Sequence, residues 1–165
     1  MRKCITFIIL ALTACSLITS CDKQAKKAEA WDFVITAKEA ELKGDQLTLI
    51  TNSEHLFAFT DRPNRKFATI SMEEWTKAWN KGSDSFEKDP PNAVLVGTNS
   101  ADEKEVLVEI QLMSAPVKVD GGYRFAVKMM TPEDATQPDG YYWTILYIDG
   151  STIRKPLRQS QERMG

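Results

Sequence analysis

Cysteine is scarce in this sequence of 165 residues, and its three copies all lie among the first 21 residues. Cys4 and Cys15 belong to a segment that we predict to be a signal peptide, and Cys21 is the predicted site of lipid attachment. We therefore expect the mature chain to carry no free thiol. This excludes a disulfide bond, a thiolate nucleophile and a cysteine-based metal site.

Histidine occurs only once, at position 55. A catalytic triad or a histidine-based metal site needs partners, and the pattern around His55 offers none. We interpret His55 as a surface residue at the end of a strand, and we predict no catalytic residue, no metal and no cofactor. A hydrolase that uses carboxylates such as Asp61 and Asp89 is a weaker alternative, because no nucleophile–base set accompanies them.

The sequence also lacks an excess of positive charge and a long apolar run. Without Arg2 and Lys3, which would leave with the signal peptide, 19 basic residues face 23 acidic ones, a net charge of −4. A nucleic-acid-binding protein needs a basic face, so we expect no nucleic-acid partner. The apolar segment from Ile5 to Leu12 is interrupted by Thr6 and is too short to be a good membrane span.

Residues 1–20 instead have the features of a lipoprotein signal peptide. Two basic residues precede the apolar segment, and the sequence Ile-Thr-Ser-Cys ending at Cys21 places small residues before a cysteine. The sequence Leu-Thr-Ala-Cys ending at Cys15 is the alternative, and we prefer Cys21 because the charged pair Asp22-Lys23 follows it. A lipidated cysteine would anchor the protein stably to a membrane. A plain secreted protein cleaved elsewhere is the remaining alternative.

Residues 21–30 are predicted to form a tether whose lysines, at positions 23, 26 and 27, lie near the membrane surface. Each lysine close to anionic headgroups adds up to about 1 kcal/mol of binding. Anchoring through Cys21 predicts a bacterial cell-envelope protein that faces the periplasm or the exterior. Asp22 weakly favours retention at the inner membrane.

Strand patterns dominate residues 31–156, which we predict to form a single β-rich globular domain followed by a polar tail at 157–165. Residues 105–112 alternate strictly between two faces, one of them apolar. The segments 40–49 and 115–127 each have the pattern strand, turn, strand. Two such hairpins favour an antiparallel β-sandwich, two packed sheets of immunoglobulin-like or similar type.

Residues 141–148 are apolar on both faces of the expected strand. This pattern favours a central strand whose second face is covered by the helix or by a loop. An exposed aromatic platform for a ligand is the less favoured alternative. Residues 151–155 are expected to add a last edge strand.

One helix is predicted at about 71–81, inserted between strands. Ser71 and Glu74 have the spacing of a capping box, in which each side chain satisfies a backbone group of the other. Trp75 shares one helix face with Met72, Ala78 and Trp79, which predicts docking on the sheet. Gly82 is expected to end the helix.

Two segments that flank this helix carry a family resemblance. Residues 59–65 read FTDRPNR and residues 84–93 read DSFEKDPPNA. In this order and spacing the sequence resembles a family of uncharacterised bacterial secreted proteins and lipoproteins with an F-[ST]-D-R-P-x-R segment, a short helix and a D-S-F-x-x-D-P-P-N-A segment. The resemblance covers nearly the whole mature domain. It implies a small β-rich envelope domain and supplies no activity.

Four charged residues in these segments form a candidate cluster: Asp61, Arg62, Arg65 and Asp89. We expect Asp61 to pair with Arg62 and Arg65 to bridge to Asp89. Our leading hypothesis is a lipid-anchored, non-catalytic binding or accessory module that recognises an envelope protein or a small ligand through residues 61–92. The alternative is a purely structural envelope lipoprotein in which the cluster locks the helix to the sheet.

Overall fold

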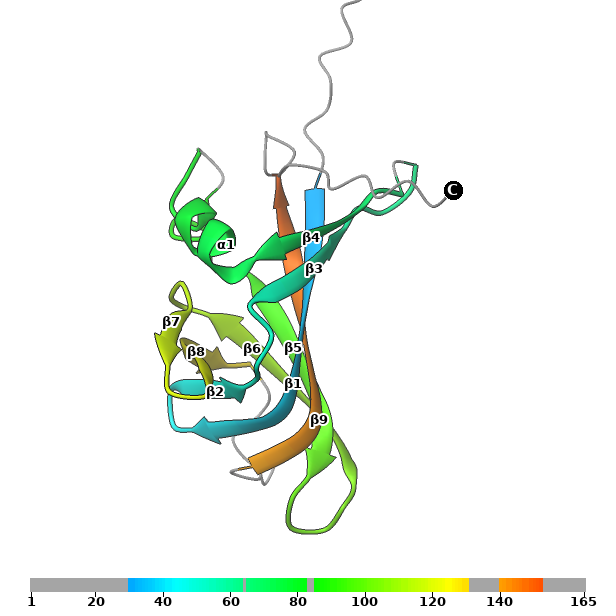
Figure 1. Ribbon diagram of the computed structural model, residues 1–165, viewed down its shortest axis with the longest axis vertical. Helices are drawn as coiled ribbons and strands as arrows, with labels where there is room; N and C mark the ends of the chain where they lie inside the picture. The colour runs from blue at the N-terminus through cyan, green and yellow to red at the C-terminus, as the bar shows by residue number, and fades with distance from the viewer. Residues whose placement is uncertain (1–29, 64, 83–84, 131–139, 153–165) are drawn as a thin grey trace, which may run out of the picture.

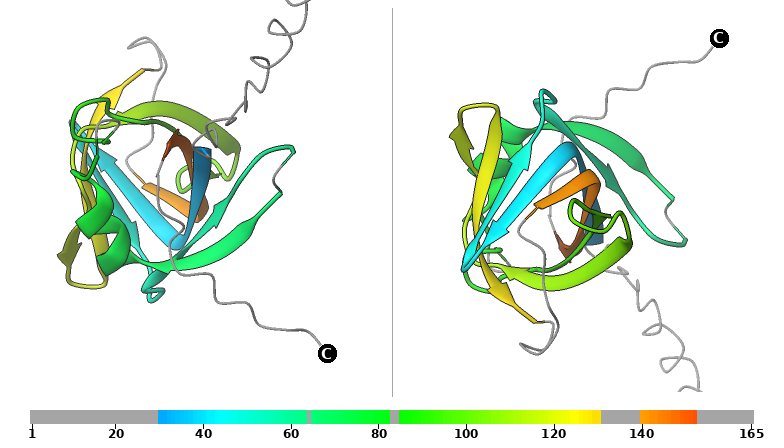
Figure 2. Two further views of the ribbon diagram at one scale, coloured as in Figure 1. Left: turned by 90° about the horizontal axis from the view of Figure 1, so that it is seen from above. Right: turned by 90° about the horizontal axis from the view of Figure 1, so that it is seen from below.

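One continuous antiparallel sheet forms the body of the protein (Figure 1). The structure, a computed structural model, describes residues 30–63, 65–82, 85–130 and 140–152. Six strands pair in a closed ring (Figure 2), because the last strand in the order also pairs with the first. In ring order they are β1 (Ala30–Lys43), β2 (Gln46–Ile50), β8 (Gly122–Met129), β6 (Glu105–Leu112), β5 (Asn92–Asn99) and β9 (Gly140–Thr152).

The remaining elements lie beyond this ring of six strands. Strands β3 (His55–Phe59) and β4 (Phe67–Ser71) form a hairpin that pairs with the first half of β1 and extends beyond the barrel (Figures 1 and 2). Strand β7 (Val117–Val119) pairs with β8, and helix α1 (Met72–Ala78) follows β4. The prediction of a mainly β protein with one inserted helix is therefore confirmed.

The two hairpins read from the sequence are present, but they do not build two sheets. Gly44 and Gly121 occupy their turns with φ angles of 58° and 75°, a backbone region that glycine enters without strain. The second strands of the two hairpins pair directly, with Leu47 opposite Phe125. This pairing of β2 with β8 joins the hairpins edge to edge, so the sheet closes into a barrel where the sequence had predicted a sandwich.

Alternation along the strands places the core inside the barrel. In β6, which has the predicted bounds, Val108, Ile110 and Leu112 are buried and Leu107 faces outward. The inward residues of the other strands follow the same period of two. They form one hydrophobic core with the helix, which includes Phe33, Ile35, Leu47, Leu49, Leu56, Ile70, Leu95, Phe125, Leu146 and Ile148.

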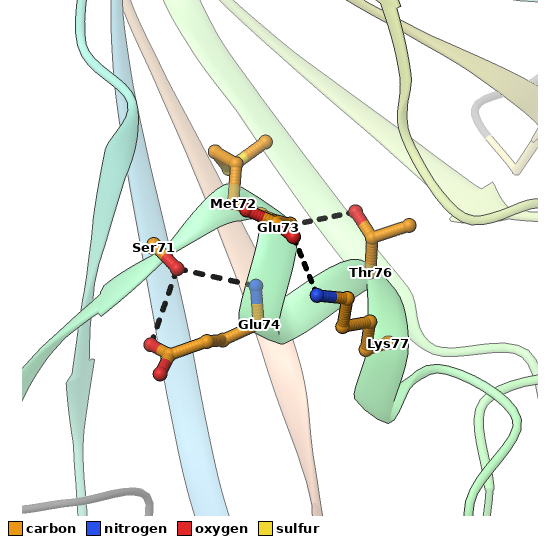
Figure 3. A network of polar contacts seen from close by, with 6 residues as sticks. All are labelled: Ser71, Met72, Glu73, Glu74, Thr76 and Lys77. Atoms are coloured by element: carbon orange, nitrogen blue, oxygen red, sulfur yellow. Dashed lines mark hydrogen bonds and ion pairs between the residues drawn. The ribbon is translucent and has the colours of Figure 1, made fainter.

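Helix α1 begins with one half of the predicted capping box, the bond to the Ser71 side chain, while the Glu74 side chain contacts the Ser71 hydroxyl and not its backbone (Figure 3). The Ser71 hydroxyl oxygen accepts a hydrogen bond from the Glu74 backbone N–H at 3.2 Å, and the same hydroxyl donates to the Glu74 carboxylate at 3.1 Å. Thr76 donates to the Met72 carbonyl at 2.7 Å, and Lys77 pairs with Glu73. The helix ends at Ala78, a little earlier than predicted.

The aromatic face of α1 completes the core. The Trp75 ring is fully buried and lies 5.7 Å from Phe33 of β1 and 6.3 Å from Phe125 of β8, measured between centroids. Because β1 and β8 do not pair with each other, Trp75 links two separate strands of the barrel. Trp79 and Phe86 pack against Trp75 and against each other, so the helix docks on the sheet as predicted.

Strand β9 corrects one prediction. It is central, lying between β5 and β1, and its inward residues Leu146 and Ile148 are buried. Its other face is not covered by the helix or by a described loop, because Trp143, Ile145 and Tyr147 are exposed. The strand also continues to Thr152, so no separate edge strand begins at 151, and residues 153–155 lie outside the described residues.

Several predictions concern segments beyond the described residues. These are the signal peptide at 1–20, lipid attachment at Cys21 or Cys15, the tether at 21–29 and the tail at 157–165.

Candidate functional site

The outside of the barrel carries an apolar surface that crosses four neighbouring strands. The strand register aligns Leu107 of β6 with Val96 of β5 and Ile145 of β9, and one row further it aligns Val94 with Tyr147 and Val34. Residues opposite each other in a sheet point to the same face. We call this surface the outer apolar face. Its members are Val34, Val94, Val96, Leu107, Trp143, Ile145 and Tyr147.

Trp143 is the most exposed member, with 84% of its surface accessible. Its φ angle is 52°, in the left-handed region that bulky side chains rarely enter. The register between β5 and β9 shifts beside it, between Val96 and Thr98, as expected for a β-bulge. A bulky residue held in this conformation costs about 1–3 kcal/mol, and such strain gathers at functional sites. The bulge therefore presents a large indole to solvent at a conformational cost.

The β3–β4 hairpin extends the apolar surface to the edge of the sheet. Phe57 and Phe67 both point outward, and their rings stack at 5.8 Å between centroids. Phe67 is 64% exposed although it lies on a strand. Phe59 contacts Tyr147 at 6.0 Å, which connects the hairpin to the outer apolar face. We call Phe57, Phe59 and Phe67 the hairpin aromatics.

The turn of this hairpin holds three of the four predicted cluster residues: Asp61, Arg62 and Arg65, all exposed. The Asp61 carboxylate accepts the backbone N–H of Arg62 at 2.6 Å, and the Asp61 carbonyl accepts the N–H of Arg65 at 3.2 Å. Thr60 completes the turn, because its hydroxyl oxygen accepts the Lys66 N–H at 2.9 Å. Asp61 thus orders the turn through backbone donors.

Asp89 lies elsewhere, in the segment between α1 and β5. Its N–H donates to the Ser85 carbonyl at 3.0 Å, within a turn that follows the helix. This segment and the β3–β4 turn lie on opposite sides of the molecule (Figures 1 and 2). Among the described residues no ion pair joins Asp89 to Arg62 or Arg65. The structure therefore does not bring the four predicted residues together.

Acidic groups gather where β1, β9 and the hairpin turn meet. Burial raises the pKa of the Asp32 carboxyl, a hydrogen bond from the Gly150 N–H at 3.0 Å opposes this rise, and the charge of Asp149 adds to it. Burial likewise raises the pKa of the Tyr147 hydroxyl, and the hydrogen bond and charge of Asp32 raise it further. The Asp32–Tyr147 pair thus ties the start of β1 to the outer apolar face.

A cleft of about 520 Å³ lies between α1, the start of β3 and the β7–β8 hairpin. Its wall includes His55, which is exposed at the first position of β3, in agreement with the predicted strand-end location. Lys118 forms an ion pair with Glu54 at 2.8 Å, which raises the pKa of Lys118 and lowers that of Glu54. Both partners are exposed, so this pair contributes little stability.

Two searches of the described residues give negative results. They contain no group of three or more histidine, cysteine, aspartate or glutamate side chains arranged to hold a metal ion. They also contain no helix long and apolar enough to cross a membrane. Comparison of the chain with protein-family models, curated proteins and solved structures finds no significant match.

The exposed side chains of β9 are the feature that sequence reasoning missed. The pattern at 141–148 was apolar on both faces, and burial of both faces was the favoured interpretation. The less favoured interpretation, an exposed aromatic platform, fits the exposure of Trp143 and Tyr147. The available signal was the tryptophan itself, placed on a second apolar face when only one helix had been predicted to cover the domain.

Proposed function

We propose that this protein is a lipid-anchored cell-envelope protein that acts as a non-catalytic binding module. Its partner is another envelope protein, which docks on the outer apolar face around Trp143. The anchor is a lipid on Cys21. We further propose that the lysines of the tether lie close to the membrane surface and that the protein faces the periplasm or the exterior.

The observation that carries the proposal is the exposed, strained Trp143 beside Ile145 and Leu107. Large aromatic side chains in the centre of an apolar patch dominate the binding energy of many protein interfaces. Contiguous exposed apolar surface is uncommon on proteins that have no partner. Trp143 also lies eight residues before Ser151, which pairs with Trp31 near the start of β1. At about 3.3 Å per residue it would sit roughly 25 Å from the anchored end, within reach of a neighbouring protein.

The internal-lock alternative has less support. It requires Arg62 and Arg65 to pair with Asp61 and Asp89, and the described ion pairs do not include these residues. We expect Arg62→Ala and Arg65→Ala to keep the wild-type melting temperature. A large fall in the melting temperature of both variants would favour the lock.

Site-specific photocrosslinking tests the proposed interface. A photoreactive phenylalanine analogue placed at Trp143 or Leu107 in cells of the native host should give a discrete crosslinked species. The matched control is Lys128, which is exposed on β8, a strand that contributes no residue to the outer apolar face. The interface proposal fails if position 128 crosslinks to the same species with the same yield.

A second arm separates loss of binding from loss of folding. Trp143→Ser should abolish the crosslink from position 107 while leaving the melting temperature within a few degrees of wild type, because the side chain is exposed. Mass spectrometry of the mature N-terminus tests the anchor independently. A chain that retains an unmodified Cys21 would contradict lipidation there.

A further inference from the structure

We propose that the β3–β4 hairpin is a second membrane contact, which lays its aromatic side chains on the lipid surface beside the anchored N-terminus. The occupant of this surface is a phospholipid bilayer. The inference rests on the proposed lipid anchor for its orientation. The side chains that would contact the lipid are the hairpin aromatics and the residues of the turn. They are present whether or not Cys21 is lipidated.

The position of the hairpin is the first argument. Phe59, the last residue of β3, pairs with Asp32, two residues after the start of β1. The described chain therefore begins beside the end of the hairpin that carries the turn, and Figure 1 shows both at the same end of the barrel. Ala30 lies nine positions after Cys21, a maximum reach of about 30 Å. A lipid at Cys21 would hold this end of the molecule close to the bilayer.

The exposed chemistry is the second argument. Phe57 and Phe67 form a stacked outward pair on a hairpin that has β1 on one side only, since among the described strands β4 pairs with β3 alone. Amphipathic surfaces that lie on membranes combine aromatic or aliphatic side chains with basic residues at the headgroup level. Arg62 and Arg65 occupy the adjoining turn and are exposed.

The charges near the turn determine how membrane binding should depend on the anionic lipid content of the membrane. Besides Arg62 and Arg65, the described groups at this end of the molecule include Lys66 and the carboxylates of Asp61, Asp32 and Asp149. Three basic and three acidic side chains leave no net charge. We therefore infer that the aromatic rings carry the contact. Anionic lipid should add only a modest gain in binding through the exposed arginines.

The test uses the chain from residue 21 with Cys21→Ser, which contains every described residue and no cysteine. A single cysteine is introduced at Thr69, which is exposed beside the hairpin aromatics and opposite Phe57, and is labelled with an environment-sensitive fluorophore. The matched control carries the label at Glu105, exposed on β6. Each protein is titrated with vesicles of phosphatidylcholine, and with vesicles in which about one-third of the lipid is phosphatidylglycerol.

We expect the probe at position 69 to shift to the blue and brighten with both vesicle types, whereas the probe at position 105 stays unchanged. Phe67→Ser should weaken the response at position 69 on the order of fivefold, the loss expected when one aromatic contact is removed. Phe67 is mostly exposed, so a melting curve should show this variant folded. If the variant unfolds, Phe67→Leu serves with a smaller expected loss.

Three results would overturn the inference. The probe at position 69 does not respond to vesicles, or both probes respond alike, or the probe at 69 responds to protein concentration without vesicles. The last result would mean that a second copy of the chain covers the hairpin. Because the test protein has no lipid, its outcome is independent of lipidation at Cys21. If Cys21 is lipidated but the probe at position 69 does not respond to vesicles, only the inference about the hairpin is wrong. If the probe responds but Cys21 is unmodified, only the proposed anchor is wrong.

Discussion

Two groups of aromatic side chains in this protein have opposite surroundings. Around α1, the rings of Trp75, Trp79 and Phe86 are buried against the barrel. On the β3–β4 hairpin and β9, Phe67 and Trp143 are largely exposed, the first on a strand and the second at a β-bulge. Both groups consist of tryptophan and phenylalanine. They differ in whether another described element packs against the rings. The one helix of the described chain packs against inward residues of the barrel, and no other described element covers the rings of Phe67 and Trp143.

The largest expected effect comes from removing the central buried ring. Trp75→Ala should lower the free energy of unfolding by about 3–5 kcal/mol, the range for a large buried aromatic residue. The Trp75 indole N–H has no hydrogen-bond partner among the described residues, so the loss is one of packing. Urea denaturation followed by circular dichroism measures it.

Trp143→Ala is the matched control for Trp75→Ala, since it removes the same side chain from the exposed group. It should change stability by no more than about 0.5 kcal/mol, because the removed atoms are exposed and alanine keeps the Cβ and therefore the backbone strain. Equal destabilisation by the two changes would contradict the comparison, because it would show that Trp143 is also part of the core.

The next effect tests the closure of the barrel. A Cβ added at Gly122 would lie 1.9 Å from the Leu49 carbonyl oxygen, so Gly122→Ala must separate β8 from β2. We expect a loss of about 1–3 kcal/mol or more, as for other overpacked sites. Gly140→Ala is the control, because its Cβ would meet only the Ser100 hydroxyl side chain, which can rotate away. Thermal melting of the two variants should differ by several degrees.

A smaller effect is expected at the start of α1. Ser71→Ala removes the hydroxyl oxygen that accepts the Glu74 N–H, which should cost about 1 kcal/mol. Ser71→Asp restores an acceptor and should recover most of this loss. If Ser71→Ala and Ser71→Asp melt together, the cap contributes nothing and the helix is held by Trp75 packing alone.

The smallest expected effect is the pH dependence of stability that Asp32 produces. The folded state raises the Asp32 pKa above its ordinary value of 3.8, so the folded protein binds more protons than the unfolded chain just above that pH. The stabilising contribution is therefore present at low pH and is lost as pH rises through the raised pKa. Asp32→Asn keeps an acceptor for the Gly150 N–H and removes the titration. The variant should gain stability relative to wild type as pH rises from about 3 to 7, and a constant difference would contradict the assignment.

Local features of this fold could be predicted from the sequence because their causes are local. The strict alternation of residues 105–112 gave the bounds of β6, and the Ser71–Glu74 spacing gave the start of α1. The turns at Gly44 and Gly121 followed from glycine and acidic residues between alternating strands. In each case the signal lies within about ten residues of the structure that it predicts.

The remaining features depend on which distant segments meet. Nothing within 40–49 or 115–127 specifies that β2 pairs with β8, and that pairing decides between a barrel and a sandwich. The charges of Asp61 and Asp89 likewise could not show that their segments lie on opposite sides of the molecule. For Trp143, periodicity indicated a second apolar face but could not show that no described element covers it.

The pairing of β1 with β9 has a consequence for the order of events during synthesis. Ala30, at the start of the described chain, lies opposite Thr152, at its end, and the two strands pair from there to Glu41 and Gly140. β1 is the first described strand to leave the ribosome, and its partner β9 is the last. Contacts between distant segments form slowly, because the chain must first bring its ends together. The barrel therefore remains open until β9 has been synthesised, and β1 lacks one of its partner strands until then.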